Sequence, residues 1–149
     1  MVCYHLISEQ AVIRNLGCRS DNDQYSHVNN SVYHLLYDSI INAYLIKHCG
    51  LDPTSSSTIG LVVSSYGQFF QPVSFPQVLE LGLRVNHIGN SSVTYEVGVF
   101  EEEKDEVCAV GGFTHVFVGS QSRRPAVLEE KLLEGLKAIL VLDKETTKL

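Results

Sequence analysis

The residues best suited to chemistry gather in one polar segment near the start of the chain. Asp21, Asp23, His27, Asn29 and Asn30 all lie within ten residues. A carboxylate can act as a base or as a nucleophile, and unpaired amides at the start of a helix can stabilise negative charge on a carbonyl oxygen. Asparagine is a good helix N-cap, so this segment predicts a helix start beside two acids. The chemistry that it favours is attack on an acyl carbonyl group.

The helix that positions these groups follows directly. We expect it to run from about Asn30 to Cys49, with Gly50 ending it in the left-handed conformation. At this length it would span ~30 Å. Apolar residues appear on most of its faces, which is typical of a helix buried on all sides.

Period-two alternation elsewhere in the chain predicts strands. A weak alternation marks residues 11–19, and stronger ones mark residues 61–70, 79–86, 93–99 and 107–118. Short turns and a charged tip at residues 101–106 join the later strands, which indicates an antiparallel meander. Pro125 is expected to open an amphipathic helix that carries Leu128, Leu132, Leu136 and Ile139.

These elements predict one α+β domain over residues 1–149, in which a curved antiparallel sheet of about five strands wraps around one long central helix and a second helix ends the chain. Such a small sheet leaves edge strands open, and pairing between two copies would cover them. We therefore expect a homodimer or a dimer of dimers.

Composition excludes several classes of function. The net charge of -6 argues against non-specific nucleic-acid binding, and no apolar run is long enough to cross a bilayer. The first residues show no targeting segment, so we expect the cytoplasm or the mitochondrial matrix. Four scattered cysteines (Cys3, Cys18, Cys49 and Cys108) show no metal-site spacing and are expected to be free thiols.

The polar segment also carries a family resemblance. Residues 21–33 read Asp-Asn-Asp-Gln-Tyr-Ser-His-Val-Asn-Asn-Ser-Val-Tyr. They resemble the Asp-x-Asp-x-x-Gly-His-Val-Asn-Asn-x-x-Tyr signature of the 4-hydroxybenzoyl-CoA thioesterase-like hot-dog proteins. Further matches follow in order at residues 69–73, 88–93, 115–118 and 124–125. The resemblance covers about residues 11–137.

The resemblance implies a hot-dog fold and hydrolysis of an acyl-CoA or acyl-carrier-protein thioester, an activity of lipid metabolism. It assigns the working carboxylate to Asp23 and the oxyanion amide to the backbone of Asn30. No cofactor is implied, because coenzyme A enters as part of the substrate. Asp21 is expected to orient the loop. Ser26 stands where the family has glycine, so it would strain the loop or narrow the pocket if that position needs a positive φ.

Other residues have two readings each. Asp38 lies about two turns into the helix after Asn30 and is a rival acid, or a polar group at a dimer seam. His27 and Asn29 could orient the acyl group, or serve as a structural hydrogen-bonding group and a helix cap. Weaker candidates for substrate binding are the strand serines Ser64 and Ser65, and Arg124, which could neutralise coenzyme A phosphates beside Arg123 or remain solvated.

Two other functions compete with hydrolysis on the same fold. One is a non-catalytic module that binds acyl-CoA or lipid without turnover. The other is a dehydratase of 3-hydroxyacyl thioesters. That reaction usually pairs a histidine with an acid, and it is disfavoured here because the motif offers His27 alone for that role. Fold alone does not separate these functions.

Overall fold

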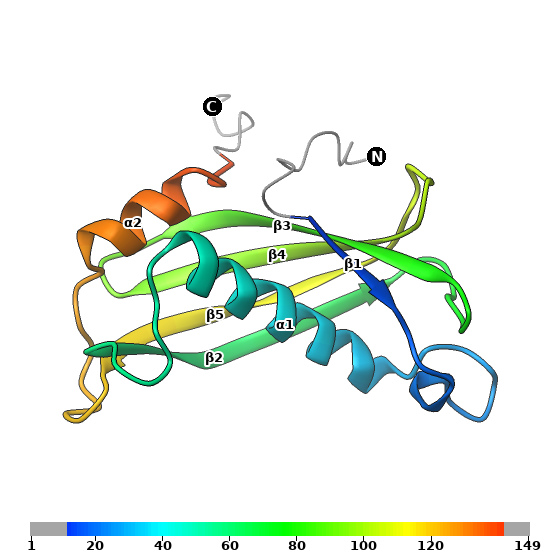
Figure 1. Cartoon of the computed structure of the whole chain (residues 1–149), viewed down its shortest axis with the longest axis horizontal. Helices are drawn as coiled ribbons and strands as arrows, with labels where there is room; N and C mark the ends of the chain where they lie inside the picture. The colour runs from blue at the N-terminus through cyan, green and yellow to red at the C-terminus, as the bar shows by residue number, and fades with distance from the viewer. Residues whose placement is uncertain (1–11, 142–149) are drawn as a thin grey trace, which may run out of the picture.

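The computed structural model describes residues 12–141 and shows a long helix lying across one face of an antiparallel sheet (Figure 1). The sheet has five strands in the order β1-β3-β4-β5-β2. The elements in chain order are β1 (Val12–Leu16), η2 (Arg19–Asp21), α1 (Asn30–His48), β2 (Thr58–Phe69), β3 (Val78–Ile88), β4 (Ser92–Glu101), β5 (Val107–Gly119) and α2 (Glu130–Lys137). The expected α+β architecture, with a central and a C-terminal helix, is confirmed.

The bounds of α1 follow from its end residues. The side chain of Asn29 accepts a hydrogen bond from the Ser31 N–H at 3.0 Å, which satisfies one of the unpaired amides of the first turn. Gly50 has a φ of 69°, and it directly follows the C-cap residue Cys49. The predicted start and end of this helix are therefore confirmed.

The burial of α1 differs from the prediction. Tyr37, Ile41 and Leu45 are fully buried against the sheet, whereas Leu35 is 63% and Ile46 is 48% exposed. The prediction of burial on all sides is wrong for a single chain, because the sheet covers only one side of the helix. The opposite side presents apolar residues to the surroundings.

Close packing between α1 and the sheet depends on a glycine. A Cβ atom at Gly111 on β5 would lie 2.5 Å from Cε2 of Tyr37, a separation that atoms do not tolerate. The absent side chain lets the Tyr37 ring lie directly on the strand. This contact brings α1 close to the sheet over its middle turns.

The sheet order corrects the predicted meander. β3, β4 and β5 do pair in sequence, but β2 pairs with β5 at the edge of the sheet instead of with β3. The segment between β2 and β3 holds Pro72 and Pro76, which cannot donate hydrogen bonds to a strand ladder. In this segment the chain instead leaves the edge formed by β2 and crosses to the opposite part of the sheet, where β3 lies between β1 and β4.

Two element bounds also differ. β1 ends at Leu16, earlier than predicted, because the following residues turn into η2; Ala11 lies outside the described residues. The final helix begins at Glu130, so the prediction that Pro125 opens it is wrong. Pro125 instead forms a bridge with Val118 at the end of β5. Of the cysteines, Cys49 and Cys108 are buried free thiols, Cys18 is an exposed one, and Cys3 lies outside the described residues.

A histidine is buried in the apolar core at the end of the sheet where β5 finishes. His115 is 3% exposed, and its ring centroid lies 4.9 Å from that of Phe113 and 5.3 Å from that of Tyr95. Its Nδ1 has no hydrogen-bond partner in the part of the chain that the structure describes. Burial lowers the pKa of His115 to about 4, because the apolar surroundings disfavour the charged imidazolium.

This histidine predicts a loss of stability in mild acid. Because its folded pKa lies below the unfolded value of about 6.5, protonation favours the unfolded chain. The free energy of unfolding should decrease by roughly 1.4 kcal/mol per pH unit as the pH falls from about 6.5 towards 4. His115→Phe should remove this slope, measured by urea denaturation at pH 7, 6 and 5. The matched control is His87→Phe at an exposed position, and equal slopes in both variants would contradict the assignment.

Candidate active site

The loop that leads into α1 is shaped by its own polar groups. Oδ2 of Asp21 accepts a hydrogen bond from the Cys18 N–H at 2.6 Å, and the Asp21 carbonyl accepts one from the Asn29 N–H at 2.8 Å. The Val28 N–H donates to the carbonyl of Val73 at 2.8 Å, which ties the loop to the segment after β2. The prediction that Asp21 orients the loop is confirmed.

Asp23 closes a tight turn and keeps one oxygen free. Its Oδ1 accepts hydrogen bonds from the N–H groups of Tyr25 at 2.7 Å and His27 at 3.2 Å. Its own N–H donates to the His27 carbonyl at 2.7 Å. Oδ2 has no hydrogen-bond partner among residues 12–141. The carboxylate is therefore fixed in orientation through one oxygen while the other stays available for chemistry.

Ser26 lies in this turn with a φ of 66°, in the left-handed region. Its N–H donates to the carbonyl of Asp23 at 3.1 Å, and its carbonyl accepts from Nδ2 of Asn22 at 3.2 Å. This conformation is one that glycine adopts without strain and serine does not. The condition under which Ser26 was expected to strain the loop, a positive φ at this position, is therefore met.

The first helical residue offers a free amide. Asn29 is the N-cap of α1, and its side chain accepts from the Ser31 N–H and from the Ser31 hydroxyl at 2.8 Å. The N–H of Asn30 has no acceptor within residues 12–141. Amides of the first turn have no partner inside the helix, and the helix dipole adds positive potential there. This N–H can therefore bind an anion or a developing oxyanion.

These groups border one cavity of about 280 Å³. It is lined by Asp23, His27, Val28, Asn30, Tyr33, Phe69, Phe70, Gln71 and Pro72. The buried end is formed by Tyr33, whose ring meets that of Phe69 edge to face with the centroids 4.9 Å apart. Phe70 is 58% exposed and belongs to the rim. Burial raises the pKa of Tyr33 to about 12, so its hydroxyl stays protonated at neutral pH.

The cavity brings together three of the predicted site residues, Asp23, His27 and Asn30, and leaves five outside. Asn29 serves as the helix cap. Asp38 is exposed on α1, where its Oδ1 accepts from Nδ2 of Asn42 at 2.9 Å. The other three lie away from the cavity of their own chain: Ser64, Ser65 and Arg124. The serines are exposed on the edge strand β2, and Arg124 follows the far end of β5.

Six lining residues were not predicted as site residues: Val28, Tyr33, Phe69, Phe70, Gln71 and Pro72. All six fall inside segments that carry the family resemblance, which was the available signal. Periodicity gave no reason to choose them, because they also fit an ordinary helix face and strand end. Within the described residues, no three histidine, cysteine, aspartate or glutamate side chains gather as a metal site. No helix in that part of the chain is long and apolar enough to span a membrane.

A family model covers more than half of this chain. The model of the Thioesterase superfamily matches residues 25–108, which include most of the cavity lining. The chain belongs to this superfamily. The PA5185 protein from Pseudomonas aeruginosa is 46% identical to it, with a TM-score of 0.84, and the match covers 87% of this chain and 90% of that one.

More distant solved structures share the hot-dog fold of this thioesterase superfamily member. A 1,4-dihydroxy-2-naphthoyl-CoA thioesterase from Synechocystis is 14% identical, with a TM-score of 0.76 over 85% of this chain and 94% of that chain. The hypothetical protein SAV2348 from Staphylococcus aureus, in complex with CoA, is 11% identical, with a TM-score of 0.79 over 87% and 82%. At these identities the likeness concerns the fold. A comparison with curated proteins gives no match.

The strained turn predicts a stabilising substitution. Ser26→Gly should raise the free energy of unfolding by about 0.5–1 kcal/mol, because relief of the left-handed strain exceeds the added entropy of the unfolded chain. Urea denaturation checks this, with Ser26→Ala as the matched control that keeps the strain. Equal stability of the glycine and alanine variants would show that φ at this position carries no cost.

Proposed function

We propose that this member of the thioesterase superfamily hydrolyses an acyl-CoA or acyl-carrier-protein thioester to the free acid and the thiol. The observation that carries the proposal is the pairing of two free groups on one cavity: Oδ2 of Asp23 and the N–H of Asn30. A carboxylate and an oxyanion donor on the same cavity suit attack on a thioester carbonyl. Membership of the superfamily supports the same reaction class.

In this proposal Asp23 delivers the nucleophile. It either removes a proton from water as the hydroxide adds to the carbonyl carbon, or it attacks that carbon itself and the resulting anhydride is hydrolysed. In both routes the carbon–sulfur bond breaks, and the thiolate leaves and takes up a proton. The Asn30 N–H and the dipole of α1 stabilise the negative oxygen of the tetrahedral intermediate. Fixing Oδ1 with two amides orients Oδ2 without a side-chain partner that would neutralise it.

In this proposal the thioester carbonyl lies beside Asn30. The acyl group extends toward the buried Tyr33, and the thiol arm leaves past the exposed Gln71. His27 lines the same cavity and is proposed to contact the acyl group. The CoA complex of the Staphylococcus aureus structure and the CoA substrate of the Synechocystis enzyme support a CoA thioester for this chain as well.

We further propose that the working form is a homodimer, or a dimer of dimers, joined through β2. This edge strand pairs on one side with β5, and Val62 and Val63 are 50% and 61% exposed on it. Leu35 on the open side of α1 is also exposed. Pairing with β2 of a second copy would provide hydrogen-bond partners for the backbone N–H and C=O groups of this edge, and it would cover these apolar side chains.

Such pairing explains how distant predicted residues would serve the site. Two identical edges that pair antiparallel place the Thr58 end of one strand beside the Phe69 end of the other. Phe69 lines the cavity, whereas Thr58 pairs with Gly119 at the far end of the sheet. Arg124 of the partner subunit would then approach the rim, where an exposed guanidinium can bind phosphate. Ser64 and Ser65 would lie at the centre of the shared edge.

The carboxylate assignment predicts a specific loss of activity. Asp23→Asn should lower kcat on acyl-CoA by about 10²–10⁴-fold while the unfolding midpoint stays nearly constant, because the amide oxygen still accepts the turn hydrogen bonds but is not basic. Asp38→Asn is the matched control on α1 and should retain activity. A panel of acyl-CoA substrates with thiol detection measures both. An active Asp23→Asn with an inactive Asp38→Asn would move the chemistry to Asp38, and saturable binding without turnover would indicate a non-catalytic acyl-CoA module.

The dimer proposal predicts a change in mass. Val63→Lys adds charge to the β2 edge and should shift the protein from an even oligomer to a monomer, with a loss of activity. Val12→Lys makes the same change on β1, where the residue is 40% exposed, and should leave the mass unchanged. Light scattering coupled to size exclusion measures both variants. A monomeric wild type would contradict the proposal.

A further inference from the structure

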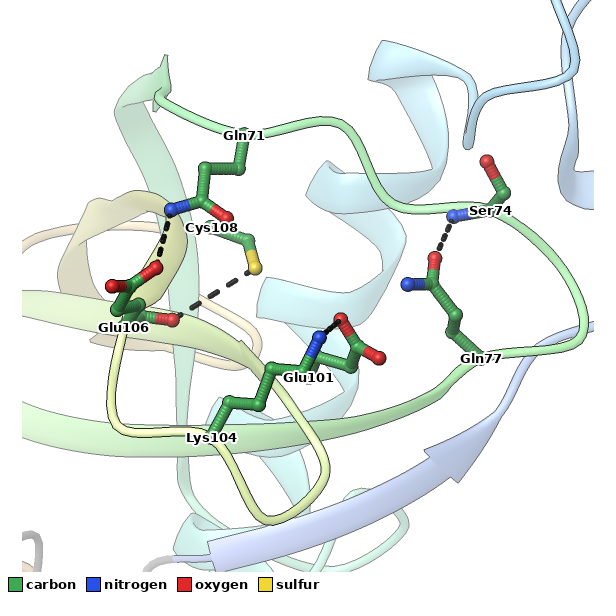
Figure 2. Close-up of polar contacts among 7 residues, drawn as sticks. All are labelled: Gln71, Ser74, Gln77, Glu101, Lys104, Glu106 and Cys108. Atoms are coloured by element: carbon green, nitrogen blue, oxygen red, sulfur yellow. Dashed lines mark hydrogen bonds and ion pairs between the residues drawn. The ribbon is translucent and has the colours of Figure 1, made fainter.

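Gln71 is held at the rim of the cavity by a residue far away in the chain. Its Nε2 donates a hydrogen bond to Oε2 of Glu106 at 3.0 Å, and Figure 2 shows the amide oxygen on the side away from that carboxylate. A carboxylate can only accept, so the contact fixes which end of the Gln71 amide faces Glu106. No group within residues 12–141 donates a hydrogen bond to Oε1 of Gln71, so this oxygen is available as an acceptor at the rim.

The backbone of the same residue is also anchored. The N–H groups of Phe70 and Gln71 both donate to the Cys108 carbonyl, at 2.9 and 3.0 Å. Cys108 is buried on β5, two residues after Glu106. The start of β5 thus fixes Gln71 through both its main chain and its side chain. Because its position is already fixed in the free protein, the Gln71 side chain loses less conformational entropy when it binds a ligand.

Two other acids of the β4–β5 hairpin have partners of their own. Glu101 pairs with Lys104 at 2.7 Å, and Glu102 pairs with Arg14 on β1. In Figure 2 the Glu101–Lys104 pair lies on the hairpin, separate from the Gln71–Glu106 contact. The hairpin was expected to be a charged tip only, yet Glu106 reaches a residue that lines the cavity. This contact connects the hairpin to the candidate active site.

We infer that Gln71 binds the thiol arm of the substrate and that Glu106 positions Gln71 for this contact. The inference rests on the proposed function, in which the thiol arm crosses the rim at Gln71. The pantetheine arm of coenzyme A carries amide N–H groups, and Oε1 of Gln71 is an acceptor of the matching type. Among the described residues that line the cavity, Gln71 and Asn30 at the helix start carry the carboxamide groups.

A double-mutant cycle tests the inference, with free CoA as the probe for binding and an acyl-CoA as the probe for turnover. Gln71→Ala should raise the Kd for CoA and the KM for acyl-CoA by about 5–10-fold, the effect of one hydrogen bond, with kcat within about twofold. Glu106→Ala should raise both by about threefold, and it should have no further effect in the Gln71→Ala background. Glu106→Gln should restore the wild-type Kd, because its amide oxygen still accepts from Gln71. Lys104→Ala on the same hairpin is the matched control.

The outcomes separate this inference from the proposed function. If the wild-type protein binds CoA but hydrolyses no thioester, the proposed hydrolysis is wrong. The Kd values of the variants for CoA would still decide the role of Gln71. An unchanged Kd in Gln71→Ala, or additive effects of the two alanine variants, would overturn the inference. Wild-type protein that does not bind CoA at millimolar concentration would overturn it as well.

Discussion

The site depends on the contact between the loop before α1 and the segment after β2, in which a buried hydrogen bond runs from the Val28 N–H to the Val73 carbonyl at 2.8 Å. Both residues are buried, at 8% and 1% exposure, so the bond is shielded from water and its loss would leave two unpaired polar groups. It joins the loop that carries Asp23 to the segment that carries Gln71. A second hydrogen bond, from the Phe75 N–H to Oδ1 of Asn22 at 3.1 Å, joins the same two segments. Together the two bonds hold the start of α1 against the opposite wall of the cavity.

The loop before α1 combines structural and chemical demands in the same residues. Asp23 lines the cavity and uses one carboxylate oxygen to close the turn, so its position is fixed by backbone amides. Ser26 adopts a positive φ that is unfavourable for serine, and this conformation lets the chain reverse between Asp23 and His27. Strain of this kind persists where surrounding contacts over-determine the backbone. The hydrogen bonds of the turn supply those contacts here.

Local patterns in the sequence predict local structure well, and they fail where distant segments decide. The N-cap at Asn29 and the terminator Gly50 define α1 because helix ends are satisfied by nearby residues. The place of β2 at the sheet edge is not visible in its alternation, since that pattern is equally compatible with pairing to β3 or to β5. The Gln71–Glu106 contact joins residues 35 positions apart on exposed segments, and no period or motif marks it. Asp23 and Asn30, which line the same cavity, could be proposed from the sequence because their signature is contiguous.

The open surface of the single chain and its open cavity have a common cause. β2 ends at Phe69, which is 45% exposed and forms part of the cavity wall, and the same strand leaves Val63 uncovered further along. Hydrolysis at a helix N-terminus gains from exclusion of water, because an oxyanion donor is worth more where the dielectric is low. A second protein surface packed against β2 would therefore both stabilise the fold and exclude water from the cavity. In the proposed dimer, covering the β2 edge and excluding water from the site would both depend on the same strand.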